Sequence, residues 1–343
     1  MNDKSKIIIK KSTLINAAIF LLFTVYFYLI LSNIKVFEIW PQITDVMQNV
    51  DSIDIKSMFS SVEAHTLRLS LLFPVMYLAH YLNIDANNLF SWILYGLILS
   101  MFVNTNHVNK YYSKKKYNSL LIASLLLALT LFMNGRGIIG LFSMSLLLRF
   151  FHYATQNSVT IRRFFITSFI ILYLSSVSSG IFFVSLCSIM LFFFFESIQY
   201  LPKTKRKDLK IVILIPAIIV SLLPFIGIYW EKNIDFYSGS ITKMLDHGLG
   251  VFLKNHSVLF FLSLFIMVSP ILASVFYSKI KKFTLFRITA GIILASVLVG
   301  LFGQLSMMMG LLPLLIIISQ FLQKIHIHAK LPHRTMQGAY TDL

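Results

Sequence analysis

A single arginine stands inside a long apolar stretch of this sequence. Arg136 lies between Gly135 and Gly137, and residues 120–148 contain no other charged side chain. An isolated guanidinium costs at least ~2.5–3.5 kcal/mol at the centre of a lipid bilayer. Either Arg136 lies outside hydrocarbon, or the protein gains something from it that offsets this cost. The residue is therefore the first candidate for a functional site.

A second group of ionisable residues lies upstream, in the segment 63–74. If this segment is helical, His65 and Arg68 are three residues apart and can meet on one face. Glu63 and Arg68 are about 140° apart around the helix and do not form a simple ion pair. The pattern is typical of an anion-binding element with an acid nearby. It is also typical of an ordinary interface helix whose charged end reaches water.

A third group lies in the segment 230–256. Trp230 and further aromatic residues alternate there with Asp246, His247 and Lys254. Aromatic faces with interleaved polar groups suit the binding of sugar rings, and they equally suit a belt at a membrane interface. The histidine spacings match no compact metal-ligand motif. Because no phosphate-loop, nucleophile-elbow or zinc-protease pattern is present either, we expect no cofactor and no metal.

The composition predicts the class of protein that holds these residues. The chain has 343 residues, of which 57% are hydrophobic and only 13% are charged, with a mean hydropathy of +0.79. Soluble domains carry about 25% charged residues. Apolar runs of up to about 20 residues recur, which is enough to cross a bilayer core of ~30 Å. We predict an all-α polytopic membrane protein, with residues 1–343 as one integral membrane domain.

Basic loops and apolar runs together predict the topology. Residues 120–148 have basic segments on both sides, so a single continuous helix would place the two flanks on opposite sides of the membrane. Two short helices joined at residues 134–137 remove this conflict and place Arg136 at the outer face. We expect Gly135 and Gly137 to permit this turn, because glycine lowers helix stability and allows a wider range of backbone conformations. We expect residues 65–83 to lie in the outer interface. Ten crossings are then expected, near 14–33, 88–104, 119–133, 137–150, 164–180, 181–195, 211–229, 257–277, 288–303 and 307–323. Eleven crossings, with 65–83 as a span, are the alternative.

The net charge of +17 follows the same arrangement. The predicted inner segments hold 23 Lys and Arg against 4 acids, and the outer segments hold 7 against 9. This asymmetry agrees with the positive-inside rule and places both termini in the cytoplasm. A nucleic-acid partner is not needed to explain the basic charge. The outer side also carries the two longest loops, 34–87 and 230–256, where function is expected to concentrate.

The stretch Asn134-Gly-Arg136-Gly-Ile-Ile-Gly resembles a feature of bacterial polysaccharide repeat-unit polymerases of the Wzy-like O-antigen and exopolysaccharide type. Members of this family are polytopic proteins of 10–14 helices, and they often carry an arginine at the outer start of a central helix. Many also have a long outer segment after the first helix, here 34–87, and an arginine in an outer loop, here Arg68. The glutamine that often follows the first arginine is absent, and the later outer loop is modest in length.

The resemblance implies a glycosyltransferase of the bacterial cytoplasmic (inner) membrane, which polymerises polyprenyl-diphosphate-linked oligosaccharides at the outer face. Arg136 and Arg68 would stabilise charge on the leaving diphosphate, and Glu63 or another outer acid would act as the base. His65, Trp230, Asp246, His247 and Lys254 would bind substrate. Partners would be the lipid-linked oligosaccharide, membrane lipids and other polysaccharide-assembly proteins.

Two other classes of function stay open at this point. A secondary transporter or a flippase for a lipid-linked substrate would favour ionisable groups at the midplane and internal repeats. A membrane acyltransferase or another lipid-modifying enzyme would need a histidine with a nearby acid, for which Asp246 and His247 are the candidate pair.

Overall fold

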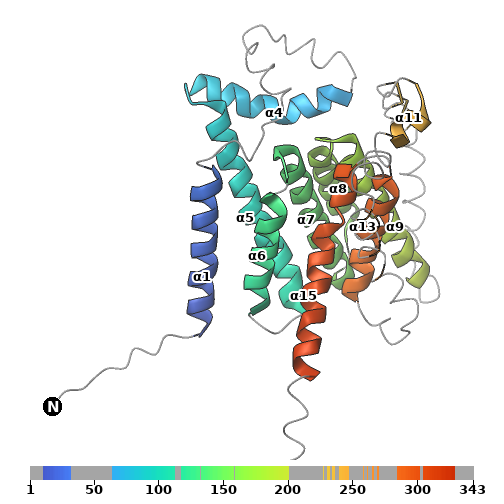
Figure 1. Cartoon of the computed structure of the whole chain (residues 1–343). Coiled ribbons are helices and arrows are strands. Elements are labelled where there is room, and N and C mark those ends of the chain that lie inside the picture. Colours follow the sequence, from blue (N-terminus) through green and yellow to red (C-terminus); the bar gives the residue numbers. More distant parts are fainter. Residues whose placement is uncertain are drawn as a thin grey trace, which may run out of the picture.

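The described part of the chain is all-helical in the computed structural model, with no strand among its residues (Figure 1). The all-α fold class expected from the sequence is therefore confirmed for this part. The structure describes residues 11–31, 64–112, 117–131, 133–157, 159–200, 239–246, 284–301 and 304–328, with isolated positions between 227 and 269.

The helices follow the order expected from the apolar runs. Their bounds are α1 Lys11–Tyr26 with the π-helix η1 Phe27–Leu31, α4 Ala64–Tyr81, α5 Ala86–Tyr112, α6 Tyr117–Leu131, α7 Gly135–Gln156, α8 Ile161–Ser175, α9 Ser179–Tyr200, α11 Ile241–Leu245, α13 Thr284–Gly300, α14 Gln304–Met308 and α15 Leu311–His328. Each predicted crossing coincides with one of these helices, except 211–229 and 257–277. Those two lie outside the described residues apart from isolated positions.

Two described helices are long and apolar enough to cross a membrane by length and composition. They are Ala86–Tyr111 and Gly135–Gln156. Five further apolar helices in the described part are shorter, with 10–17 residues. This coarse evidence is compatible with membrane association, although a buried core helix of a soluble protein passes the same test. The arrangement with ten crossings stays a prediction.

The predicted break within residues 120–148 is present. Helix α6 ends at Leu131 and α7 begins at Gly135, with Asn134 as the residue that caps α7. Arg136 is therefore the second residue of α7 rather than the tip of the turn. The glycines also differ from expectation, since the only described glycine with a positive φ is Gly239.

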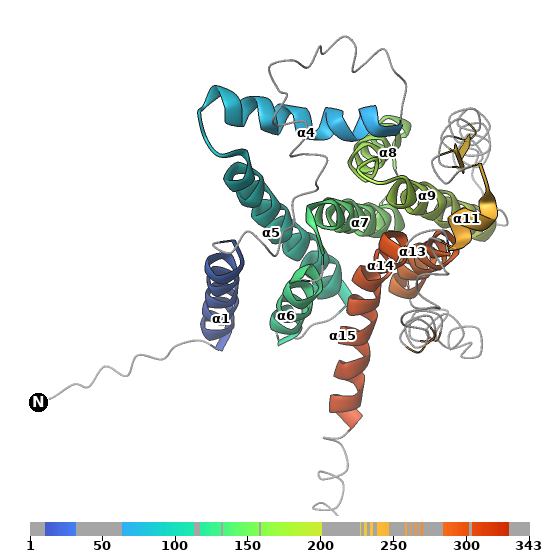
Figure 2. The ribbon, with the colours of Figure 1, turned by 45° about the horizontal axis from the view of Figure 1, so that its top comes forward.

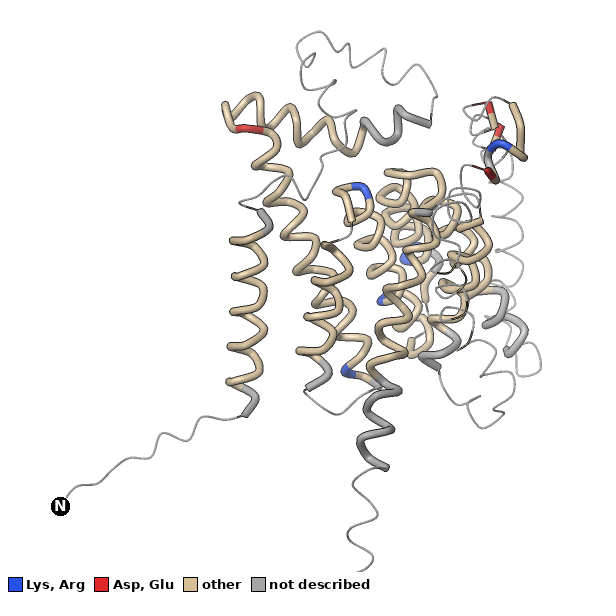
Figure 3. The backbone as a smooth tube through the Cα atoms, viewed as in Figure 1, with Lys and Arg blue, Asp and Glu red and all other residues tan. Residues whose placement is uncertain are grey.

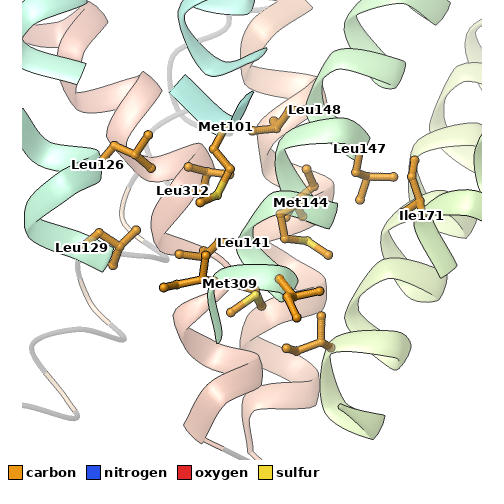
Figure 4. Close-up of a cluster of buried hydrophobic side chains, with 14 of the residues drawn as sticks. Met101, Leu126, Leu129, Leu141, Met144, Leu147, Leu148, Ile171, Met309 and Leu312 are labelled. Carbon is orange, nitrogen blue, oxygen red and sulfur yellow. The ribbon is translucent and has the colours of Figure 1, made fainter. Parts of the chain in front are cut away.

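Helix α7 lies at the centre of the bundle, in contact with α5, α8, α9, α13 and α15 (Figure 2). Its core-facing side chains include Leu141, Met144, Leu147 and Leu148. Figure 4 shows these residues interleaved with side chains from neighbouring segments, among them Met101, Leu126, Ile171, Met309 and Leu312. Because neighbours cover α7 on most sides, its two ends are positioned by the packing of the whole bundle.

A small polar cluster adds to this packing. The Ser175 hydroxyl of α8 lies 3.0 Å from the Ser143 hydroxyl of α7 and 2.6 Å from the Ser185 hydroxyl of α9. All three side chains are fully buried. Small residues allow close approach of helices and let hydroxyls bond across them. These bonds join the middle of α7 to the two helices that follow it.

Helix α4 is oriented differently from the rest. Figures 1 and 2 show it lying across one end of the bundle, in a direction different from that of α1 and α6. It leads through a turn at Asn83 into the start of α5. The Ser70 hydroxyl lies 3.2 Å from that of Tyr173 near the end of α8. The location of this helix in an outer membrane interface stays a prediction. We call this end of the bundle the α4 end.

Candidate functional site

The first turn of α7 begins at a well-formed cap. Asn134 has an extended backbone, with φ −77° and ψ 171°, and its side-chain oxygen accepts a hydrogen bond of 2.9 Å from the Gly137 amide. Such a cap satisfies one of the amide groups that have no partner within a helix. The start of α7, and with it the position of Arg136, is therefore set locally by Asn134.

The two glycines beside Arg136 allow close contact with neighbouring side chains. A Cβ atom on Gly135 would lie 3.2 Å from Phe90 Cε1, near the start of α5. A Cβ atom on Gly137 would lie 2.9 Å from Met133 Sδ. The contact with Phe90 also places the start of α7 at the α4 end. Arg136 therefore lies between two glycines that pack closely against neighbouring side chains.

The electrostatics of this turn favour an anion. Arg136 is partly buried, and its Nε atom is shielded from solvent. The start of a helix carries a positive partial charge, so a cation placed there is electrostatically unfavourable. The first turn of α7 contains no acidic residue. A guanidinium and a helix N-terminus in one place together attract a negatively charged group, and a phosphate suits both.

Helix α4 brings the second candidate group to the same end. His65 and Arg68 lie in its first two turns, as the sequence analysis expected, although their side chains lie outside the described part. Glu63 precedes the helix and also lies outside the described residues. The structure therefore places the backbone of His65 and Arg68 at the α4 end, and the role of Glu63 as a base stays a prediction.

The third candidate group is described in part. The Trp230 ring packs edge-on against Phe183 in α9, with 6.3 Å between ring centroids. Phe183 lies in the first turns of α9, close to Ile181, which contacts Gly140 of α7. Asp246 is exposed at the end of α11. His247 and Lys254 lie outside the described residues, so a pairing of Asp246 with His247 stays a prediction.

Charge is distributed unevenly between the two ends of the bundle. Figure 3 shows that the acidic residues whose side chains are described lie toward the α4 end, whereas basic residues occur at both ends. The side chain of Glu196, near the end of α9, lies outside the described part. The charge count of the sequence predicts the same kind of asymmetry, with most acidic residues on one side. The elements that carry Arg68, Arg136, Trp230 and Asp246 therefore share one end of the molecule. The structure does not bring their side chains into a described contact.

The opposite half of the α5–α7 interface contains polar groups that the sequence analysis did not single out. Arg149 Nη1 donates a hydrogen bond of 2.8 Å to Asn104 Oδ1, and Asn104 Nδ2 donates one of 3.2 Å to Ser145 Oγ. One turn further, the rings of His107 and His152 are 5.9 Å apart. The contacts advance in the same direction along both helices, which shows that α5 and α7 run parallel.

The same part of α5 is polar on its other faces. The Ser119 hydroxyl of α6 donates to Asn106 at 2.7 Å, and the Ser319 hydroxyl of α15 donates to Asn109 at 3.1 Å. The signal in the sequence was the run Asn104-Thr-Asn-His-Val-Asn109 at the end of the predicted crossing 88–104. Within this run, Asn104 and His107 are three residues apart and so lie on one face of α5. Ser145, Arg149 and His152 follow one another at intervals of four and three residues and so lie on one face of α7.

No group of three or more His, Cys, Asp or Glu side chains that could hold a metal ion occurs among the described residues. Comparisons of the chain with protein-family models, with curated proteins and with solved structures find no match.

Proposed function

We propose that this protein is a membrane glycosyltransferase that polymerises polyprenyl-diphosphate-linked oligosaccharide repeat units at the outer face of the bacterial cytoplasmic membrane. The observation that supports the proposal is the position of Arg136. A partly buried guanidinium in the first turn of the central helix, beside a capped helix N-terminus, is a fitting receptor for a diphosphate. The resemblance of residues 134–140 to the Wzy-like polymerases supplies the substrate class.

In the proposed reaction, a hydroxyl oxygen of the acceptor sugar forms a bond to the anomeric carbon of the donor saccharide. The bond between that carbon and the diphosphate oxygen breaks, and the polyprenyl diphosphate leaves with the bonding electrons. The hydroxyl proton passes to an outer carboxylate, for which Glu63 is the candidate. Arg136 and Arg68 stabilise the negative charge that develops on the diphosphate. The sugar–phosphate bond supplies the free energy.

The apolar outer surface of the helices supports the membrane location. Large apolar side chains are exposed on α1 and α8, including Phe20 at 75% and Phe169 at 69%. Soluble monomers rarely expose contiguous apolar patches larger than a few hundred Å². Lipid chains would cover these faces. The α4 helix and the acidic residues then lie at the outer side, with both termini in the cytoplasm.

The test is the polymer made by cells that carry Arg136 variants. Arg136→Lys keeps the charge but loses the planar fork, so we expect it to lose most polymer. Arg136→Ala should reduce the rate about 10²–10³-fold, the usual effect of removing one donor to a developing anion. The matched control is Lys243→Ala, which removes an exposed cation of α11 at the same end.

The measurement is the length ladder of the surface polysaccharide, with the amount of protein in the membrane determined in parallel. A normal ladder from Arg136→Lys would contradict the diphosphate role, because a lysine reaches water as easily as an arginine that merely snorkels. Loss of the ladder from Lys243→Ala at a normal protein level would also contradict it, since a general effect of charge would then be sufficient.

A second candidate function is transport of the lipid-linked saccharide across the membrane. The observation in its favour is the polar α5–α7 interface around Asn104 and Arg149, because polar groups inside a helical bundle mark pathways in many transporters. The two functions separate in reconstituted vesicles. A transporter moves a labelled lipid-linked oligosaccharide between leaflets without extending it, whereas a polymerase extends it and releases polyprenyl diphosphate.

A further inference from the structure

Arg149 differs from the other described basic residues in how it is held. Its guanidinium donates to Asn104, which is only 4% exposed, and Asn104 donates to Ser145. The Ser145 hydroxyl in turn donates to the Phe142 carbonyl at 2.7 Å. These hydrogen bonds connect Arg149 of α7 to Asn104 of α5, and Asn104 to Ser145 of α7. They fix the position of one edge of the guanidinium. Arg149 itself remains exposed, so its other N–H donors are accessible.

Among the side chains that the structure describes, no carboxylate pairs with Arg149. Its one hydrogen bond there goes to a neutral amide. His107, exposed one turn further along α5, adds a second nitrogen-bearing side chain that can hydrogen-bond an oxygen. A guanidinium that is held by a neutral amide and keeps free N–H donors is a receptor for an oxyanion such as phosphate.

The position of Arg149 along α7 indicates where such an anion would come from. Thirteen residues separate it from Arg136, which is ~20 Å of helix at 1.5 Å per residue. If Arg136 lies at the outer face, Arg149 lies in the inner leaflet of a bilayer whose core is ~30 Å thick. Although α7 is the central helix, the Arg149 side chain is exposed.

Helices α5 and α8 both contact α7 close to Arg149. Arg149 bonds to Asn104 of α5, and one turn further along α7 the Arg163 guanidinium of α8 stacks over Tyr153, 3.6 Å from the ring centroid. Both helices expose apolar side chains, with Val103 at 58% and Phe169 at 69%. An exposed guanidinium on a helix whose neighbours expose apolar side chains suits an amphiphile better than a soluble anion.

We propose that Arg149, held by Asn104 between α5 and α8, binds the phosphate of an anionic membrane lipid from the inner leaflet, with the acyl chains lying along α5 and α8. The proposal depends on insertion of the chain into a membrane, and it is independent of the reaction proposed at Arg136. Binding there would stabilise the α5–α7 interface at the end opposite to α4.

The test uses the full-length protein in detergent micelles, with lipid binding measured by native mass spectrometry. Three probes separate the parts of the ligand: dioleoyl phosphatidylglycerol, dioleoylglycerol without a phosphate, and glycerol 3-phosphate without acyl chains. The wild-type protein should bind the whole lipid at least about tenfold more tightly than either part. Binding of glycerol 3-phosphate as tight as that of the lipid would overturn the proposal in favour of a soluble ligand.

Variants identify the site. Arg149→Gln should weaken binding of phosphatidylglycerol at least about tenfold, as expected for loss of a hydrogen bond to a charged group. Asn104→Asp should do the same while keeping the arginine, because the new carboxylate would pair with it. The control is Arg162→Gln, an exposed arginine of α8 for which the structure shows no such chain of hydrogen bonds.

The outcomes are distinct. Unchanged binding by Arg149→Gln, or an equal loss in Arg149→Gln and Arg162→Gln, would overturn the site, because non-specific attraction to basic surface would then explain the binding. Should Asn104→Asp fail to fold, Arg149→Gln and its control still decide the question, since Arg149 is exposed and its substitution leaves no buried charge. Polymer formation plays no part in this measurement.

Discussion

Gly140 offers the sharpest test of the packing that positions α7. A Cβ atom at this position would collide with Ile181 Cδ1 of α9 and would lie 3.2 Å from Met309 Sδ. Ile181 is fully buried, and a β-branched side chain in a helix has one strongly preferred rotamer. Gly96 in α5 has no atom within 4 Å of the corresponding position. Gly140→Ala and Gly96→Ala therefore differ mainly in whether the added methyl group meets neighbouring side chains.

The expected magnitudes follow from two opposing effects. Alanine in place of glycine stabilises a helix interior by about 0.5–1 kcal/mol, so Gly96→Ala should stabilise the protein by that amount. Gly140→Ala gains the same helix stability but adds a methyl group to a packed core, which costs about 1–3 kcal/mol. The helix term cancels in the comparison. Gly140→Ala should therefore be about 1–3 kcal/mol less stable than Gly96→Ala.

The assay is unfolding of the purified protein in mixed micelles by titration with sodium dodecyl sulfate, followed by circular dichroism. Equal stabilisation by the two substitutions would refute the reasoning, because it would mean that α9 does not approach α7 closely at Gly140. A loss of stability in Gly96→Ala would also count against it, since that position would then be packed. The result bears on function, because the same contact holds the turn that carries Arg136.

Two further predictions concern the topology and the start of α7. A reporter domain fused after Lys116 should be cytoplasmic and one fused within 239–250 extracytoplasmic, and an extracytoplasmic signal after Lys116 would instead make residues 65–83 a crossing. Asn134→Ala should lower the free energy of unfolding by about 1 kcal/mol through loss of the helix cap. In the same denaturant titration, no loss of stability would show that the bond from Asn134 to the Gly137 amide contributes little.

Much of the helical layout was predictable because the signals are local. The break between α6 and α7 followed from the conflict between two basic flanks, and in the structure α6 ends at Leu131 and α7 begins at Gly135. The glycines were interpreted for the wrong reason. Gly135 and Gly137 lie inside the helix and serve close packing, which depends on Phe90 and Met133 and is invisible in the local sequence.

The sequence by itself determined the helical class, the order of the helices and the presence of an arginine at the start of α7, because apolar runs and the residues that interrupt them are local properties of the chain. Only the tertiary structure decided that α7 is central, that α4 lies across one end, and that Asn104 holds Arg149 from 45 residues away. The physical reason is that an interface between parallel helices depends on the relative rotation and translation of both, and packing of the whole bundle sets these quantities.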